Sequence, residues 1–104
     1  MPGYLLAYHG GHAGDSLEGR KRVMAGFGRW FAGLGPRLVD PGNPVSRAVT
    51  AGAGSVGEGG GANPVSGYTV IEAGGMQTVI ELVRRGPVVQ GGRTVEIVET
   101  VPAL

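Results

Sequence analysis

The chain lacks cysteine and lacks any long apolar run, and these two absences narrow what it can do. With no cysteine among its 104 residues, it can form no disulfide, hold no cysteine-ligated zinc and use no thiolate nucleophile. No apolar stretch approaches the roughly 20 residues that span a bilayer, and the opening MPGYLLAYHG lacks the basic region and cleavage site of a signal peptide. We therefore expect a cytoplasmic protein that does not enter a membrane.

The chain also lacks an excess of charge of either sign. Nine Lys and Arg residues against eight Asp and Glu residues give a formal net charge of +1, and these charges are spread without a long run. Proteins that bind nucleic acid or anionic membrane surfaces use clustered basic side chains. We therefore expect neither nucleic acid nor a membrane as a partner.

Glycine, in contrast, is present in large excess. The chain has 22 glycines and 7 prolines, which together reach the range of about 25–30% at which unpatterned chains are often disordered. The glycines, however, gather between segments that keep regular apolar periods, and they are densest over residues 52–61. The sequence therefore predicts one ordered domain over residues 1–104, with one flexible arm at residues 52–61.

The first half of the chain predicts a strand, a helix and a second short strand. In Gly3–His9 both alternating faces are largely apolar, as in a central strand that is covered on two sides. A helix over residues 16–34 follows, since Asp15 is a suitable N-cap with Glu18 three residues on, and apolar residues then recur at spacings of three and four. Residues 37–40 have the character of a short second strand.

The second half repeats this scheme. Ser66–Glu72 is the clearest strand pattern of the chain and should lie near the centre of the fold. The apolar spacing of residues 76–83 is typical of a second helix, which should end at Gly86 and Pro87. Thr94–Val101 is the last strand. The order β-α-β-β-α-β predicts an α+β, ferredoxin-like fold, in which a four-stranded antiparallel sheet carries two helices on one face.

Between the second and third of these strands, residues 47–51 and 55–58 are weaker strand patterns around a turn near Ala53, which predicts an extra hairpin. The helices can cover only one face of the sheet, so the other face needs a partner. Two copies packed sheet to sheet would bury it as a barrel-like dimer, with a cavity on each subunit between sheet and hairpin. The sequence therefore predicts a homodimer through the open sheet face and a cavity for a small-molecule ligand.

Four segments of the chain keep the order and spacing of a known family, namely LLAYHGG, VDPGNPV, GGGANPVSGYTVIEA and RGPVVQGGRTVEIVE. Together they resemble the YCII-related family, also called DGPF-domain proteins, of the dimeric α+β barrel group. The resemblance covers nearly the whole chain and implies a ferredoxin-like fold and a homodimer. It implies little about chemistry, because most members have no assigned reaction and a His/Asp pair has been suggested as catalytic in one branch only.

The chain departs from that branch at the residues that would carry the chemistry. Residues 16–34 contain no histidine, and Gly86 stands where an aspartate would precede Pro87. The DGPF motif itself is replaced by GANP at residues 61–64. The resemblance therefore implies the fold and the dimer, and the catalytic pair of that branch is not carried over to this chain.

Two residues at strand ends are candidates for acid–base chemistry. His9 ends the first strand and Asp40 ends the second, so the imidazole could meet the carboxylate there. It would then act as a general base or as a hydrogen-bond donor to a ligand. A histidine at a strand end that has no catalytic role is the commoner case.

The spacing His9, His12, Asp15 also places nitrogen and oxygen ligands at equal intervals, which could hold a divalent metal. The surrounding loop is rich in glycine and has no rigid element to direct these ligands. Asp15 moreover already has a capping role that explains it. We therefore expect no metal site here.

The tetrapeptide NPVS occurs twice, at residues 43–46 and 63–66. If the segment between the two copies forms a hairpin, the copies stand side by side at its base and form a polar rim for a ligand. An aromatic residue on the strand that follows could stack on a planar ligand. The alternative is two similar turns that begin strands and bind nothing. The candidates for ligand binding are Asn43, Asn63, Ser66 and Tyr68.

No motif indicates a cofactor. The glycine-rich run GSVGEGGGANP lacks the GK[ST] ending of a phosphate-binding loop, and the chain has no G-x-S-x-G nucleophile elbow. Three functions remain open: a dimer that binds a small polar molecule, a small acid–base enzyme that uses His9 with Asp40, and a dimerisation module without a ligand. The sequence identifies neither the ligand nor a reaction.

Overall fold

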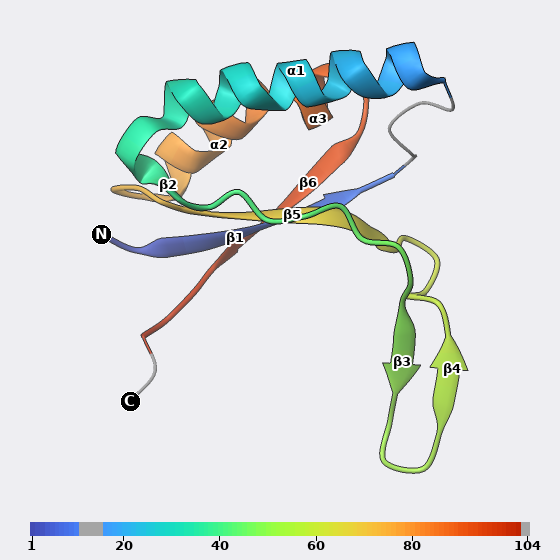
Figure 1. Cartoon of the computed structure of the whole chain (residues 1–104). Helices are drawn as coiled ribbons and strands as arrows, with labels where there is room; N and C mark the ends of the chain where they lie inside the picture. The colour runs from blue at the N-terminus through green and yellow to red at the C-terminus, as the bar shows by residue number, and fades with distance from the viewer. Residues whose placement is uncertain (11–15, 103–104) are drawn as a thin grey trace.

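The structure, a computed structural model that describes residues 1–10 and 16–102, has two layers. An antiparallel sheet forms one layer, and the helices lie against one of its faces (Figure 1). Both middle strands of the sheet are strands that the sequence predicts as central. The sheet has the strand order β2-β5-β1-β6, with β1 (Gly3–His9), β2 (Leu38–Asp40), β5 (Val65–Glu72) and β6 (Thr94–Glu99).

Helices and a hairpin complete the described chain. The helices are α1 (Leu17–Leu34), α2 (Met76–Arg84) and the short α3 (Pro87–Gln90), with a 3-10 turn η1 (Gly35–Arg37) after α1. Strands β3 (Val49–Ala51) and β4 (Val56–Glu58) form a separate hairpin between β2 and β5. The sheet strands and the two longer helices follow the order β-α-β-β-α-β, so the fold is the predicted ferredoxin-like α+β fold. None of the described helices has the length and apolar character that crossing a membrane requires.

Helix α1 begins at Leu17, one residue later than the sequence predicts. Its N-cap is Ser16, whose Oγ accepts a hydrogen bond from the backbone N–H of Gly19 at 3.0 Å. Asp15, the predicted cap, lies outside the described residues. Both residue types suit the position, because a short side-chain oxygen satisfies the free N–H groups of the first turn. Residue type alone therefore does not decide which of the neighbouring Asp and Ser residues is the N-cap of α1.

Pro87 begins one helix as well as ending another. Helix α2 ends at Arg84, just before the predicted stop at Gly86 and Pro87. Pro87 is then the first residue of α3, since its fixed φ suits the first turn, where no backbone N–H is needed. The sequence does not predict α3, because a helix of 4 residues is too short to show an apolar period.

The core lies between the sheet and the helices. Leu6 and Tyr8 of β1 point toward the helices and are at most 6% exposed. Phe27 of α1 packs against the Tyr8 ring at a centroid distance of 5.7 Å, and Trp30 Nε1 donates to the Leu82 carbonyl of α2 at 3.0 Å. These contacts stabilise α1, whose several glycines lower its intrinsic helix propensity. The other buried apolar residues of this core are Tyr4, Leu34, Ile71, Ala73, Val79, Val83 and Val88.

A buried hydrogen-bond chain joins β1 to the segment that follows β2. The Tyr8 hydroxyl donates to Thr69 Oγ1, and Thr69 Oγ1 donates to the Pro41 carbonyl at 2.9 Å. Burial raises the pKa of Tyr8 to about 12, so the phenol stays protonated and remains a donor. Thr69 is therefore fully buried without an unsatisfied hydroxyl.

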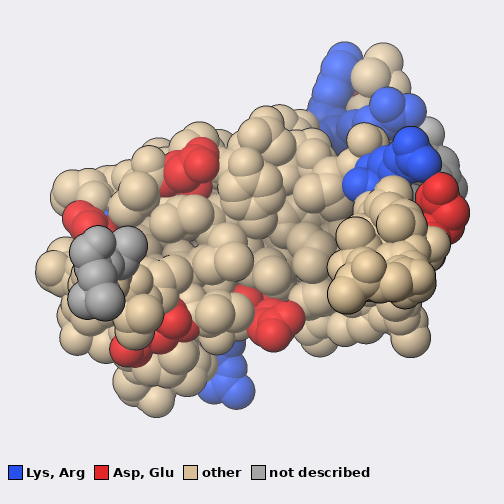
Figure 2. Space-filling model, turned by 90° about the horizontal axis from the view of Figure 1, so that it is seen from below, with Lys and Arg blue, Asp and Glu red and all other residues tan. Residues whose placement is uncertain are grey.

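The other face of the sheet is not covered by any described helix (Figure 1). Leu5 lies opposite Val70 on one side and Val98 on the other. On the edge strand β2 the register shifts between Leu38 and Asp40, so that Asp40 is the residue opposite Val70. Val39 lies beside Asp40, and its other neighbour Leu38 packs on the core. Val39 is 56% and Val98 39% exposed. We call these four side chains, Val39, Val70, Leu5 and Val98, the apolar row, and Figure 2 shows their face from below with uncharged residues over its middle.

The β3–β4 hairpin projects from the same side of the sheet as the apolar row (Figure 1). Its turn is closed by a hydrogen bond from the Gly52 N–H to the Ser55 carbonyl at 2.7 Å, around Ala53 as predicted. Arg47, which precedes β3, pairs with Glu58 of β4 at 2.9 Å. All residues of both strands are exposed, so in a single chain the hairpin is held by its own hydrogen bonds and gains little from burial.

Candidate functional site

His9 ends β1 on the open face of the sheet and is only 8% exposed. Its Nδ1 lies 2.9 Å from the Asn63 carbonyl and 3.3 Å from the Pro64 carbonyl, and its Nε2 lies 3.0 Å from Glu96 Oε1. All three partners are acceptors, so both ring nitrogens are placed to donate. Only the doubly protonated imidazolium can do this. The site therefore holds a largely buried cation.

The electrostatics of the site agree with this protonation state. The hydrogen bond to Glu96 is the largest cause that raises the pKa of His9 above its usual value. Burial acts in the opposite direction, and the carbonyls of Asn63 and Pro64 raise the pKa further. The net effect favours the charged ring.

Two features of the sheet bring these groups together. The pairing of β1 with β6 sets Ala7 opposite Glu96 and His9 opposite Thr94, so the Glu96 side chain lies beside the imidazole on the same face. The pairing of β1 with β5 shifts between Tyr8 and His9. This irregularity turns the end of β1 toward the carbonyls that precede β5 at the base of the hairpin.

The structure does not bring Asp40 to His9, which corrects the predicted pair. Asp40 lies on β2, with β5 between it and β1, and its Oδ1 accepts a hydrogen bond from the Gly42 N–H at 2.9 Å. Glu96 is the carboxylate at the imidazole, and the sequence analysis did not single it out. The strand TVEIVE carries two acidic residues, Glu96 and Glu99, among its apolar ones. This was a signal for Glu96, although the partner of each depends on the strand register.

The two NPVS segments meet as predicted, and they do so through the backbone. The Val45 N–H donates to the Ser66 carbonyl at 3.1 Å, and the Tyr68 N–H donates to the Asn43 carbonyl at 3.3 Å. Gly42 allows this approach, because a Cβ there would lie 1.8 Å from the Tyr68 carbonyl oxygen. The first copy therefore serves as an extension of the sheet edge beside β5.

The four ligand-binding candidates divide between two places. Asn43 Nδ2 donates to the Tyr68 hydroxyl at 3.4 Å on the exposed surface. Asn63 offers its backbone carbonyl to His9, while Ser66 Oγ already donates to a backbone carbonyl of β1 at 3.2 Å. Contact of these four side chains with a ligand stays a prediction.

Two members of the possible metal motif, His12 and Asp15, lie outside the described residues. Among the residues that the structure describes, no group of three or more His, Asp or Glu side chains is close enough to hold a metal ion. His9 itself directs both nitrogens at hydrogen-bond acceptors.

Gly86, which stands where the resemblance expects an aspartate, is required by packing. A Cβ at this position would lie 2.9 Å from Trp30 Cε2 and 3.1 Å from the Val83 carbonyl oxygen. The indole thus takes the space that a side chain at residue 86 would need. The absence of a side chain at residue 86 thus allows the contact of Trp30 on α1 with the end of α2.

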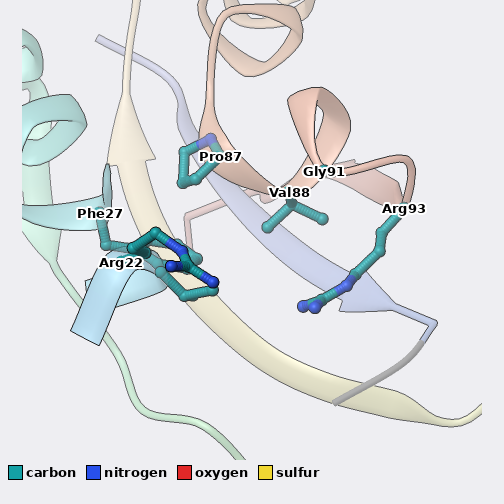
Figure 3. Close-up of a pocket in the computed structure, with 7 residues that line it drawn as sticks. Arg22, Phe27, Pro87, Val88, Gly91 and Arg93 are labelled. Atoms are coloured by element: carbon teal, nitrogen blue, oxygen red, sulfur yellow. The ribbon is translucent and has the colours of Figure 1, made fainter. Parts of the chain in front are cut away.

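The part of the chain that the structure describes has cavities that open to solvent, and the two given next do not lie between sheet and hairpin. One, of about 210 Å³, lies on the helix side between α1 and α3 (Figure 3). The other, of about 480 Å³, lies between the two ends of the described chain, next to Met1 and Pro102. The space beneath His9 is an open face in a single chain, so a second sheet would have to enclose it.

A solved structure shares this architecture. The chain is similar to 5-chloro-2-hydroxyhydroquinone dehydrochlorinase from Burkholderia phenoliruptrix AC1100, solved in complex with 2,5-dihydroxybenzoquinone, with a TM-score of 0.60 and 16% sequence identity. The likeness covers 99% of this chain and 96% of the other. No family model and no curated protein matches the chain. At this identity the likeness establishes the fold.

The pH dependence of stability should report the His9 hydrogen bonds. Because the pKa of His9 is raised in the folded chain, these bonds stabilise it fully below the unfolded pKa of about 6.5, and the effect is lost as the pH rises through the folded value. We expect His9→Gln to lower the free energy of unfolding by about 1–3 kcal/mol near pH 5.5 and by less near pH 8.5. Urea unfolding at equal protein concentration measures both differences.

Glu96→Gln is the matched control for this measurement. It keeps an oxygen acceptor near Nε2 but removes the charge, so the pH-dependent part should shrink while the bonds to Asn63 and Pro64 remain. If His9→Gln costs the same free energy at both pH values, the ring is neutral in the folded chain and its description as an imidazolium is wrong.

Proposed function

We propose that the chain acts as a homodimer that binds a small polar molecule, one that carries an anionic oxygen, next to His9. We also infer that it is a divergent relative of the YCII-related, DGPF-domain proteins. The ferredoxin-like fold supports this relationship, since it is the fold that the sequence resemblance implies.

The apolar row supports the dimer. Leu5, Val70 and Val98 lie opposite one another on three neighbouring strands of the open face, and Val39 lies near them on β2. Val39 and Val98 are 56% and 39% exposed. A second copy packed against this face would bury the row on both subunits, which is the usual role of a continuous apolar surface. Light scattering at micromolar concentration should then give about twice the chain mass of 10.5 kDa.

The ligand site rests on one observation, the unequal burial of the His9–Glu96 pair. The His9 side chain is 10% exposed and that of Glu96 is 63% exposed. The cation is therefore the fixed member and the carboxylate is the member that can move into solvent. An anionic oxygen of a ligand could replace Glu96 at Nε2, while Nδ1 stays bonded to the base of the hairpin.

The second sheet of the dimer would close this site from below. Exclusion of water lowers the local dielectric constant, and a charge-assisted hydrogen bond is stronger in such surroundings. The dimer and the ligand site thus belong to one proposal, because in a single chain the Glu96 side chain, whose place the ligand would take, is 63% exposed to water.

An acid–base enzyme is the second candidate, and the 3.0 Å contact of His9 Nε2 with Glu96 Oε1 favours it. In this function Glu96, in place of the predicted Asp40, is the carboxylate that works with His9. The imidazolium would donate a proton to the substrate and the carboxylate would accept one. Binding comes first in either case, so binding is what the experiment measures.

The binding experiment uses 2,5-dihydroxybenzoquinone as its first probe. A panel of small carboxylic acids and other hydroxyquinones is then tested in the same way. A dehydrochlorinase of this fold was solved with this compound bound, and its acidic hydroxyl groups supply anionic oxygens. We expect saturable binding by calorimetry, and a loss of affinity in His9→Gln of about tenfold to a hundredfold, as for a hydrogen bond to a charged group.

Two variants separate the candidates. Glu96→Gln should bind the probe at least as tightly, because it replaces the carboxylate that competes for Nε2 with a neutral and weaker acceptor. An enzyme that uses Glu96 would lose turnover in the same variant. Asp40→Asn should change nothing, since its carboxylate binds the Gly42 N–H. Equal affinity of His9→Gln and the unsubstituted chain would contradict the site, and no binding across the panel would leave a dimerisation module without a ligand.

A further inference from the structure

The β3–β4 hairpin stands apart from the body of the domain. Its strands run nearly at right angles to the sheet, on the side of the open face (Figure 1), and all of their residues are exposed. The Cα radius of gyration of the chain is 14.8 Å, whereas a compact domain of about 100 residues has about 13 Å. An isolated two-stranded hairpin is only marginally stable in water. A single chain therefore gives this element little of the burial that usually stabilises a hairpin.

The base of the hairpin is fixed to the sheet, which sets the direction of the hairpin. Before β3, the Val45 N–H donates to the Ser66 carbonyl of β5 at 3.1 Å. After β4, the Asn63 carbonyl lies 2.9 Å from His9 Nδ1 of β1. A projecting element that is already held in one direction has less ordering entropy to lose when it binds another surface.

The hairpin has one apolar face. Val49 pairs with Glu58, and Ala51 pairs with Val56; residues that are directly paired lie on the same face of two antiparallel strands. Val56 is 74% and Val49 46% exposed. The Thr50 side chain points to the opposite face, because successive side chains of a strand alternate. We call Val49, Ala51 and Val56 the hairpin face.

The outer part of the hairpin carries no charge. Residues 48–57 contain no acidic or basic side chain, and the charges next to them, Arg47 and Glu58, pair with each other at 2.9 Å. Strand edges that stay in water usually carry charged side chains, which prevent contact with other chains. Depletion of charge is instead typical of the centre of a protein interface. The composition of the hairpin therefore favours contact with another polypeptide.

The dimensions of the open face indicate that this polypeptide is a second copy of the chain. Four strands about 4.8 Å apart and about 20 Å long cover roughly 400 Å², whereas a stable interface takes about 800 Å² from each partner. Residues 48–53 span about 17 Å, and packed sheets lie about 10 Å apart. The hairpin would therefore reach past a second sheet on the open face and along its side, and add the contact area that the sheet lacks.

We propose that the hairpin is a dimerisation arm, and that the hairpin face of each subunit packs against the side of the other subunit's sheet. In a twofold-symmetric dimer both arms make the same contact, so the gap between the two sheets, with His9 at its margin, is bordered by both hairpins. This inference rests on the dimer of the proposed function and extends its interface beyond the apolar row.

Val56→Glu tests the contact of the hairpin face. The new carboxylate would be buried against the partner without a counter-charge, so the dissociation constant of the dimer should rise at least about a hundredfold. Thr50→Glu is the matched control, since it adds the same charge to the opposite face of the hairpin, and should change the constant less than about threefold. Sedimentation over a dilution series measures the constant. Equal losses in the two variants would contradict the assignment of the hairpin face as the contact.

A shortened hairpin tests the arm without an added charge. Thr50 and Gly57 are paired, so a two-residue Asn-Gly turn can join them in place of residues 51–56. The fold should be kept, because these residues do not belong to the core, and circular dichroism checks this. We expect the dissociation constant of the dimer to rise at least about tenfold, since much of the hairpin face is removed.

Hydrogen exchange separates a failure of this inference from a failure of the proposed dimer. The comparison is with Val70→Glu, whose new charge on the apolar row should separate the subunits. Backbone amides of residues 48–58 should exchange at least about tenfold more slowly in the unsubstituted dimer than in this variant. A dimer with equally fast exchange there, and with a dissociation constant that neither hairpin variant changes, would overturn the arm and leave the sheet-to-sheet dimer standing. A chain that is monomeric at micromolar concentration would overturn both.

Discussion

Gly42→Ala should lower the free energy of unfolding by about 3–5 kcal/mol. Gly42 has a φ of +73°, and a Cβ there would lie 1.8 Å from the carbonyl oxygen and 2.7 Å from the carbonyl carbon of Tyr68. Both atoms belong to the backbone of the central strand β5, so no side-chain rotation can relieve the collision. The segment after β2 would have to move away from the sheet.

That movement would break several bonds at once. The Asn43 carbonyl accepts from the Tyr68 N–H at 3.3 Å, and the Pro41 carbonyl accepts from buried Thr69 at 2.9 Å. Loss of the second bond leaves a buried hydroxyl without its acceptor, which costs about 1–3 kcal/mol by itself. Urea unfolding of the variant measures the total.

Gly59→Ala is the matched control for Gly42→Ala. Gly59 also has a positive φ, +84°, but a Cβ there would meet no atom within 4 Å. Its substitution should cost only the backbone strain of about 1–2 kcal/mol. Equal losses in the two variants would show that the collision with Tyr68 is relieved cheaply and that Gly42 is needed only for its backbone conformation.

Val70→Glu should convert the proposed dimer into a monomer. Val70 lies opposite Leu5 in the apolar row, so in a sheet-to-sheet dimer the new carboxylate would be buried without a partner. Burial of an unpaired charge costs several kcal/mol, which is enough to move a micromolar equilibrium to the free subunit. Light scattering should then give the mass of one chain.

Met24→Glu provides the comparison for this experiment. Met24 is 65% exposed on α1, in the layer on the other side of the sheet, so the same change from an apolar to an acidic residue should leave the dimer intact. The monomer of Val70→Glu should stay folded, because Val70 does not belong to the core between sheet and helices. A Val70→Glu variant that keeps the dimer mass would move the interface to another surface, such as the hairpin.

Several elements were predictable because their signals are local. The strand Gly3–His9 is found with the predicted bounds, and β5 and α2 agree with prediction to within about one residue, since alternation and helical spacing are read along a single segment. The hairpin also follows from its own turn residues. The cap of α1 and the short helix α3 were missed, because neighbouring residues suited the same cap and a Gly-Pro pair can begin a helix as well as end one.

The site was predictable in part only. His9 was found as a strand-end imidazole, although its placement on the open face was not, and the proximity of the two NPVS segments followed from the hairpin. The predicted carboxylate partner of His9 was wrong. Both Asp40 and Glu96 are acidic residues on strands of the sheet, and the sequence does not say which strand lies beside β1. The sheet order places β6 next to β1 and leaves β2 at the far edge.

By itself, the sequence determined the kind and order of the elements, and through them the ferredoxin-like sheet with one uncovered face. Spacing along one segment suffices for this, because a helix or strand buries one side of its own chain. Only the tertiary structure decided which groups meet. The pairing of His9 with Glu96 joins residues 87 positions apart, and the hydrogen bond from Trp30 to the Leu82 carbonyl joins residues 52 positions apart. Such contacts depend on strand register and on the packing of side chains from distant segments, and no local period in the chain records either of them.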